Sequence, residues 1–222
     1  MSTIRYALTS GMLFVFLYLY LVKRTSKSKI QQELPKKKDL QRELFYSWLT
    51  LMIFSLFMMI PLNSILRPYT MLYYDVQEFG WGYLIFTCIV LVFIHDAYFY
   101  LIHRLLHSNA FKKYHIIHHK STNPTPLAAL SFHPVEAILQ VMFFVIVLFL
   151  IPLHLFAIGF LGLFLFVHNA YGHSGFELSK FKNNKFFVNS INHNLHHKHY
   201  HGNYGLYFTI WDRLFKTKIK KD

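Results

Sequence analysis

Long runs of apolar residues alternate with short polar and basic segments along this chain. Five runs are long enough to predict apolar helices. They cover residues 6–22, 44–60, 81–102, 135–151 and 155–168. The fifth run is short for a complete crossing of a bilayer, so the last two runs predict either two spans or a shallow hairpin. The pattern as a whole predicts an all-α membrane bundle of about four to five spans.

The segments between the runs carry most of the charge. Residues 23–43 hold eight Lys or Arg, residues 103–134 hold four, and residues 169–222 hold nine. Basic loops stay in the cytoplasm under the positive-inside rule, and an odd number of spans brings these three segments to that side. The first run is interpreted as a retained anchor rather than a signal peptide, because no small-residue cleavage site follows it.

Composition supports a membrane protein and argues against several other classes. The chain is 54% hydrophobic and carries a formal net charge of +13. Binding to nucleic acid is a weaker interpretation of that charge, because long apolar runs separate the basic segments. The single cysteine, Cys88, rules out both a disulfide framework and a thiolate metal site.

Histidines in three spaced motifs are the chemical signature of the chain. The motifs read HxxxH, HxxHH and HxxHH, and they consist of His103, His107, His115, His118, His119, His193, His196 and His197. Residues at i, i+3 and i+4 share one helix face, so each motif points its imidazoles to one side. The short SNAF segment, 108–111, could fold the second motif back toward the first. Eight imidazoles exceed the four ligands of one tetrahedral zinc, which suggests two metals.

The zinc-protease interpretation of the first motif fails, because HExxH requires a glutamate that this sequence lacks. Interfacial histidines without a metal are the simplest alternative, but three motifs on one side of a membrane argue against it. A histidine-lined metal transporter would need ligands at mid-membrane depth, and only His95 lies well inside a predicted helix. The pattern therefore favours a membrane enzyme with its metal site in a cytoplasmic, histidine-rich helical cap.

The sequence around the motifs resembles the fatty acid hydroxylase and sterol desaturase superfamily. The resemblance rests on HDAYFYLIHRLLH, KKYHIIHHKSTNPTPLAALSFHPVEA and NHNLHHKHYHGNYGLYFTIWDRLF, and it covers roughly residues 81–216. The flanking PTP, FHP and NYG…WDRLF are most similar to the sterol C5-desaturase branch, whereas HSG at 173–175 resembles the C4-methylsterol oxidase branch. We therefore divide the chain into N-terminal membrane helices with a basic loop, 1–80, and a fatty acid hydroxylase-like di-iron domain, 81–222.

The resemblance implies a non-haem centre of two iron ions (Fe), O2 as co-substrate and a lipid substrate taken from the bilayer. It carries the eight motif histidines over as metal ligands, adds His173 as a ninth and leaves His168 as a candidate tenth. Imidazole also suits zinc and copper, so iron follows from the resemblance alone. Sterol, fatty acyl, sphingolipid and carotenoid substrates stay open, as does the choice between hydroxylation and desaturation.

Electrons must reach such a site from outside, since the sequence has no haem, flavin or Rossmann signature. The resemblance implies a donor of the cytochrome b5 or ferredoxin type, with its reductase. Basic loops could dock an acidic carrier or bind anionic lipid.

Asp96 is one of very few acids inside an apolar run, where a charge is costly and usually functional. It shares a predicted helix face with His103 and His107, so it is expected either to hydrogen-bond a metal-bound histidine or to anchor the helix. A pairing with Arg104 or with a buried hydroxyl is the alternative. Outside the motifs, we expect a structural hydrogen bond at His133, interfacial positions for His154 and Trp211, and solvent exposure at His199 and His201.

Overall fold

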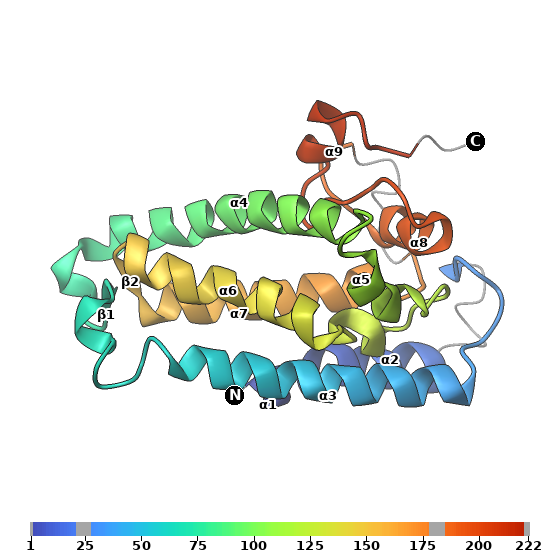
Figure 1. Ribbon diagram of the computed structural model, residues 1–222, viewed down its shortest axis with the longest axis horizontal. Coiled ribbons are helices and arrows are strands. Elements are labelled where there is room, and N and C mark those ends of the chain that lie inside the picture. The colour runs from blue at the N-terminus through green and yellow to red at the C-terminus, as the bar shows by residue number, and fades with distance from the viewer. Residues whose placement is uncertain (1, 21–27, 178–184, 220–222) are drawn as a thin grey trace.

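The computed structural model describes residues 2–20, 28–177 and 185–219. Four long helices run along the long axis of the molecule, as Figure 1 shows. They are α3 (Lys37–Met59), α4 (Gly80–Leu106), α6 (Pro134–Leu150) and α7 (Leu155–Gly172). The prediction of an all-α bundle is confirmed.

The N-terminal segment is helical throughout its described part and packs beside α3 and α7. Its α-helical and π-helical turns are α1 (Ser2–Tyr6), η1 (Ala7–Gly11), α2 (Met12–Phe14) and η2 (Val15–Tyr20). Within the described part of the chain, three helices are long and apolar enough to cross a membrane: Thr3–Tyr20, Gly80–Leu106 and Leu155–Gly172. α7 runs past its predicted end at 168, which gives it spanning length, whereas α6 is a shorter apolar helix.

A parallel pair of two-residue strands closes the end of the bundle away from α5 and α8 (Figure 1). Leu72 of β1 (Leu72–Tyr73) pairs with Leu153 of β2 (Leu153–His154). The 3₁₀ turns η4 (Arg67–Tyr69) and η5 (Val76–Glu78) flank β1. These contacts fix the loop between α3 and α4 against the turn between α6 and α7.

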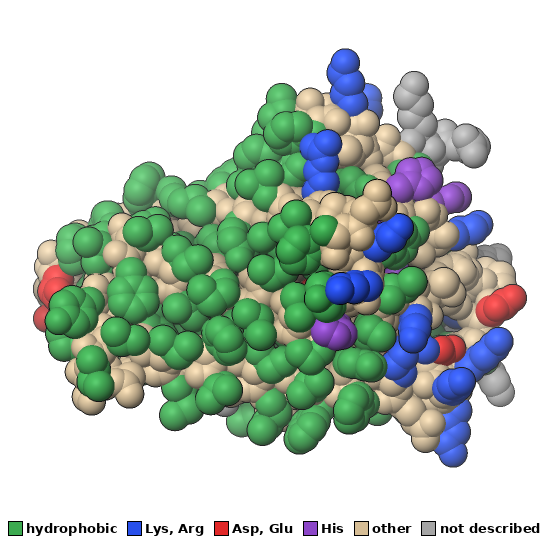
Figure 2. All heavy atoms as spheres, in the orientation of Figure 1, with side chains coloured by type: hydrophobic (Ala, Val, Ile, Leu, Met, Phe, Trp, Pro, Cys, Tyr) green, Lys and Arg blue, Asp and Glu red, His purple; other side chains and the backbone are tan. Residues whose placement is uncertain are grey.

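The core has two main parts, both formed by apolar helix faces. α4, α6 and α7 enclose Leu91, Val147 and Leu161, while α3 and α6 meet the N-terminal helix around Phe54 and Val141. The outward face of α4 stays apolar, with Ile85 and Phe93 both at least half exposed. Figure 2 shows apolar side chains covering the body of the molecule, as a surface in contact with lipid requires.

The other end of the bundle carries the remaining helices and most of the charge in view. α5 (Lys112–His119), the 3₁₀ turn η6 (Pro126–Leu130), α8 (Ser190–His199) and α9 (Ile210–Leu214) gather there. Figure 2 shows the lysines and arginines of this face concentrated at the same end. The structure thus brings histidines and basic side chains together, as the loop pattern predicted. Basic residues in 21–27 and 178–184 lie outside the described residues.

Candidate metal centre

Three helices deliver the motif histidines to one place. His103 lies in the last turn of α4 and His107 caps that helix. The chain turns at 108–111, where the Lys112 N–H donates to the Ser108 carbonyl, and α5 starts directly afterwards. This turn folds the second motif back onto the first, as the sequence predicted. α8 brings the third motif from the C-terminal region.

The histidines form two groups, and within each group the ligand atoms lie within 4.8 Å of one another. The first group, named here site A, consists of His103, His107, His115, His119 and His196. The second, named site B, consists of His118, His173, His193 and His197. Nine of the ten histidines predicted as ligands therefore converge, and they do so in two sets.

His168 stays outside both sites. It precedes His173 by five residues on α7, and at 3.6 residues per turn five residues turn a helix by about 140° beyond a full rotation. Its ring packs 5.1 Å from the Tyr207 ring and 6.1 Å from the Phe164 ring, measured between centroids. The helical geometry that places His173 in site B thus turns His168 toward the C-terminal segment.

Spacing within the two sites matches nitrogens that share a cation. In site A, Nε2 of His115 lies 3.1 Å from Nε2 of His103 and 3.0 Å from Nε2 of His119. In site B, Nε2 of His173 lies 3.1 Å from Nε2 of His118 and 2.9 Å from Nε2 of His193. Two nitrogens bound to one metal at about 2.1 Å, with a right angle between the bonds, lie about 3.0 Å apart.

Oxygen acceptors fix the tautomers of four of these rings. The Nδ1 hydrogen of His103 is donated to the Tyr204 carbonyl at 2.9 Å, that of His196 to the Gly202 carbonyl at 2.7 Å, and that of His173 to the Asn169 carbonyl at 2.8 Å. The fourth, from His115, is donated to Oε1 of Glu136 at 2.8 Å. Metal-bound imidazoles characteristically hold their second nitrogen in this way.

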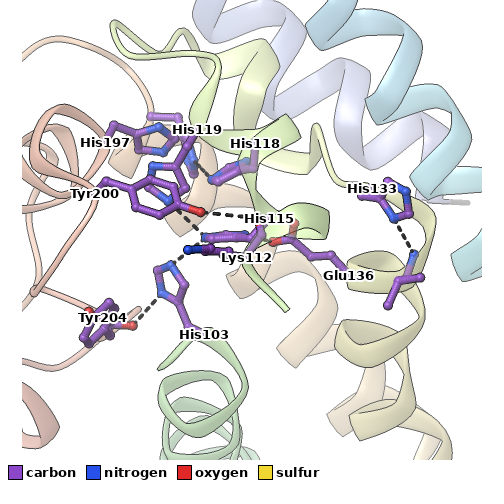
Figure 3. Close-up of polar contacts among 12 residues, drawn as sticks. His103, Lys112, His115, His118, His119, His133, Glu136, His197, Tyr200 and Tyr204 are labelled. Atoms are coloured by element: carbon purple, nitrogen blue, oxygen red, sulfur yellow. Dashed lines mark hydrogen bonds and ion pairs between the residues drawn. The ribbon is translucent and has the colours of Figure 1, made fainter. Parts of the chain in front are cut away.

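These contacts leave lone pairs facing one another inside site A. His103 and His115 both commit their Nδ1 hydrogen to an oxygen, so neither Nε2 carries a hydrogen. Figure 3 shows the two rings directed toward each other, with Glu136 behind His115 and Tyr204 behind His103. Two lone pairs about 3 Å apart repel, and a cation that both nitrogens coordinate removes that repulsion. Among the described residues, Nε2 of His196 and both ring nitrogens of His107 also lack a hydrogen-bond partner.

The electrostatics of the sites keep the imidazoles neutral. Burial lowers the pKa of His115, His118, His193 and His197 well below the usual value of 6.5, and the neighbouring histidines lower it further. A neutral imidazole keeps the lone pair that binds a metal. The donor set therefore fits two metal ions, one in each site.

Glu136 is the functional residue that the sequence interpretation missed. Its side chain is 1% exposed, and it lies in the first turn of α6 opposite α5. The sequence did contain a signal, since Glu136 is the second residue of the apolar run 135–151 and a carboxylate there needs a partner just as Asp96 does. No spacing rule linked it to His115, however, because the two residues belong to different helices.

Asp96 anchors the C-terminal segment and touches none of the nine clustered histidines within the described hydrogen bonds. Its Oδ1 accepts from the Tyr207 N–H at 2.7 Å and its Oδ2 accepts from the Trp211 indole N–H at 2.9 Å. This is the helix-anchor alternative, with neither Arg104 nor a histidine as partner. Trp211 therefore packs against α4 rather than serving only as an interfacial residue.

The loop after α8 carries the carbonyls that hold site A. Tyr200, Gly202 and Asn203 all have positive φ, so the chain reverses tightly there. The Asp212 carboxylate then accepts from the backbone N–H groups of Tyr204 and Gly205 at 2.8 and 2.9 Å. These bonds fix the Tyr204 carbonyl in position for His103.

The remaining histidines take structural or exposed positions. His133 and His154 cap α6 and α7, each accepting from a backbone N–H through Nδ1. His95 is buried in α4, where its Nδ1 lies 3.1 Å from the Tyr207 hydroxyl oxygen. His199 and His201 are exposed, as expected.

Comparison with known proteins identifies relatives over most of the chain. Residues 88–217 match the family model described as fatty acid hydroxylase. Lathosterol oxidase of Mus musculus is 34% identical over 189 residues, which cover 80% of this chain and 60% of that protein. Delta(7)-sterol 5(6)-desaturase ERG3 of Saccharomyces cerevisiae is 34% identical over 170 residues, covering 75% of this chain and 44% of that protein. This chain thus spans 60% or less of the length of these two relatives. No solved structure matches it significantly.

Proposed function

This chain belongs to the fatty acid hydroxylase family, and from that premise we propose that it is a membrane oxidoreductase that uses O2 to desaturate a sterol. Relatives named as lathosterol oxidases and Delta(7)-sterol 5(6)-desaturases support a sterol substrate and a double bond formed between C5 and C6. The NYG…WDRLF signature agrees with that branch. The HSG at 173–175 makes oxidation of a C4-methylsterol the second candidate.

The observation that carries the proposal is the pair of buried, neutral histidine sites at one end of an apolar bundle. In the proposed enzyme each site holds one iron ion, bound through the nine converged histidines. Bound iron supplies the oxidising power that breaks an unactivated C–H bond with O2, which no side-chain acid or base can do. Ligands restricted to one end of the bundle also favour an enzyme over a metal transporter.

The chain's own residues orient and shield this centre. The carbonyls of Gly202 and Tyr204 and the Glu136 carboxylate hold the histidines of site A in the metal-binding tautomer. The Phe99 ring packs 5.1 Å from His103 and the Phe132 ring packs 5.2 Å from His118, so apolar side chains exclude water from the substrate side. Such a site favours oxidation of a bound lipid over loss of oxidant to solvent.

Each turnover also requires two electrons from an external donor, and we propose a cytochrome b5 or ferredoxin type of carrier with its reductase. The basic end of the molecule lies next to the histidine helices (Figure 2), which suits an acidic carrier. Increasing salt should then raise the KM for the carrier while leaving the KM for the lipid unchanged.

We place the histidine end on the cytoplasmic side of the membrane, following the positive-inside rule. In a Cys88→Ser background, Lys120→Cys should be protected from an impermeant thiol reagent applied outside. Thr70→Cys, at the other end of the bundle, should react. Labelling at 120 without labelling at 70 would reverse the proposed orientation.

The activity is tested by lipid analysis of a host that accumulates a Δ7-sterol and lacks its own C5 desaturase. Expression of the chain should produce a 5,7-diene, identified by mass spectrometry and by the ultraviolet absorption of the conjugated double bonds. His119→Ala at equal expression is the control and should produce none. A hydroxylated or C4-oxidised sterol would support the second candidate, and an unchanged sterol profile with metal-loaded protein would reject both.

A further inference from the structure

A small cavity lies among α3, α4, α6 and α7, next to the two histidine sites. It has a volume of about 10 Å³. Its lining consists of Phe54, His95, Phe99, Leu130, Phe132, Gln140, Leu165 and Asn169. That volume is close to the minimum that holds one water molecule, so it also suits one hydroxyl group.

Three lining residues connect the cavity to the proposed ligands of both sites. Phe99 packs against His103 of site A, and Phe132 packs against His118 of site B. Asn169 provides the backbone carbonyl that accepts from Nδ1 of His173 in site B. The cavity therefore borders both halves of the metal centre.

Polar groups converge on this otherwise apolar cavity. Gln140 and Asn169 are buried, with 6% and 4% of their surfaces exposed, and both line it. Among the described residues, neither side-chain amide takes part in a hydrogen bond. His95 is the third polar group, and only its Nδ1 is engaged, by the Tyr207 hydroxyl. Buried amides normally have partners, so two unpaired amides facing one small cavity indicate a polar ligand group.

A second, larger cavity of about 70 Å³ adjoins the first, with Phe54 and Leu165 lining both. Its other lining residues are apolar side chains of α3, α6 and α7, among them Val141 and Phe144, together with Gly162 and with Arg5 of the N-terminal segment. The two cavities together offer a polar end beside the histidines and an apolar extension away from them.

We propose that Gln140, Asn169 and His95 bind the hydroxyl group of the substrate, with its hydrocarbon body lying toward the second cavity. The inference rests on the proposed function and refines it. In a 3-hydroxysterol only three bonds, each about 1.5 Å long, separate the hydroxyl oxygen from C5. A hydroxyl site next to the metals therefore suits a sterol oxidised at C5, and it does not suit an acyl chain oxidised far from its polar end.

The test compares a Δ7-sterol carrying the 3-hydroxyl with the same sterol lacking it. Both are assayed for turnover by reconstituted enzyme and for binding to purified metal-free protein. Loss of the substrate hydroxyl should reduce wild-type binding and kcat/KM by roughly 10- to 100-fold, because it leaves buried amides unpaired. Gln140→Leu and Asn169→Leu should lower both quantities for the hydroxysterol and abolish most of the difference between the two sterols.

The variants are chosen to leave the metal centre in place. Asn169 holds His173 through its backbone carbonyl, which the Asn169→Leu variant retains. Tyr98→Phe is the matched control, because Tyr98 donates to the carbonyl of Leu139, beside Gln140, yet does not line the cavity. This control should keep the full preference for the hydroxysterol.

Two failures are distinguishable. Equal binding and equal turnover of both sterols by the wild type would overturn the hydroxyl site while leaving the desaturase function intact. Absence of any sterol turnover would overturn the proposed function, and the binding comparison on metal-free protein would still decide whether the cavity recognises a hydroxyl.

Discussion

Replacing Glu136 is expected to weaken site A and spare site B. The Glu136 carboxylate accepts a 2.8 Å hydrogen bond from Nδ1 of His115, and both side chains are almost fully buried. Glu136→Gln retains an oxygen acceptor in place of the carboxyl group, whereas Glu136→Leu removes the acceptor. Glu136→Gln weakens the contact that orients the His115 ring, and Glu136→Leu removes that contact.

The magnitude follows from comparable contacts to metal-bound histidines, whose loss typically lowers metal affinity or activity about 10- to 100-fold. That range corresponds to about 1.4–2.8 kcal/mol. We expect Glu136→Gln near the lower value and Glu136→Leu near the upper one. No described contact links Glu136 to site B, so one metal per chain should be retained at its original affinity.

The assay is metal content by mass spectrometry during dialysis against a graded chelator. Wild-type protein should lose two ions over a similar range, and the variants should lose one of them much earlier. Glu43→Gln is the control, because Glu43 is an equally buried acid whose carboxylate accepts from the Thr125 hydroxyl at 2.6 Å. If both ions leave the Glu136 variants together, or if neither leaves earlier, the division into two sites held by separate contacts is refuted.

Three further predictions follow. His119→Ala should abolish turnover while membrane insertion persists, whereas His154→Ala, which loses a helix cap worth about 1 kcal/mol and a hydrogen bond to the Tyr74 carbonyl, should keep most activity in the same lipid assay. Asp96→Asn should lower the thermal unfolding temperature of the detergent-solubilised protein by weakening the anchor to Tyr207, and unchanged stability would reject the anchor role. Burial raises the pKa of Glu43 from 4.5 to about 7, so folding takes up a proton and stability falls as pH rises through that window. Glu43→Gln should therefore match the wild type at about pH 5 and unfold at a higher temperature at about pH 8.

The sequence predicted the parts of this molecule that local patterns encode. Apolar runs marked the bundle helices, and i, i+4 spacing placed His103 with His107 and His193 with His197 on shared faces. The turn at 108–111 could also be predicted, because one continuous helix would hold the first two histidine motifs apart.

Contacts between elements far apart in the sequence could not be predicted from such local patterns. Glu136 meets His115 across two helices, and Asp96 meets a backbone N–H more than a hundred residues away. The division of nine histidines into two sites depends on how α5 inserts between α4 and α8. Three of the four groups that orient the histidine rings are main-chain carbonyls. Their positions cannot be predicted from the identity of the residues that carry them. The sequence also could not show that His168, five residues before His173, would lie outside both clusters.

Those main-chain carbonyls bear on how the site tolerates genetic change. A carbonyl persists through every side-chain substitution, so mutations at 169 and 204 leave the oxygens that orient His173 and His103 in place. Gly202 is the exception, since its φ is +68° and a Cβ there would lie 2.5 Å from the Thr217 carbonyl oxygen. Side-chain changes at 169 and 204 should therefore leave these two carbonyl contacts intact, while a one-residue insertion or deletion between 198 and 205 would displace the carbonyls of Gly202 and Tyr204 and inactivate the centre.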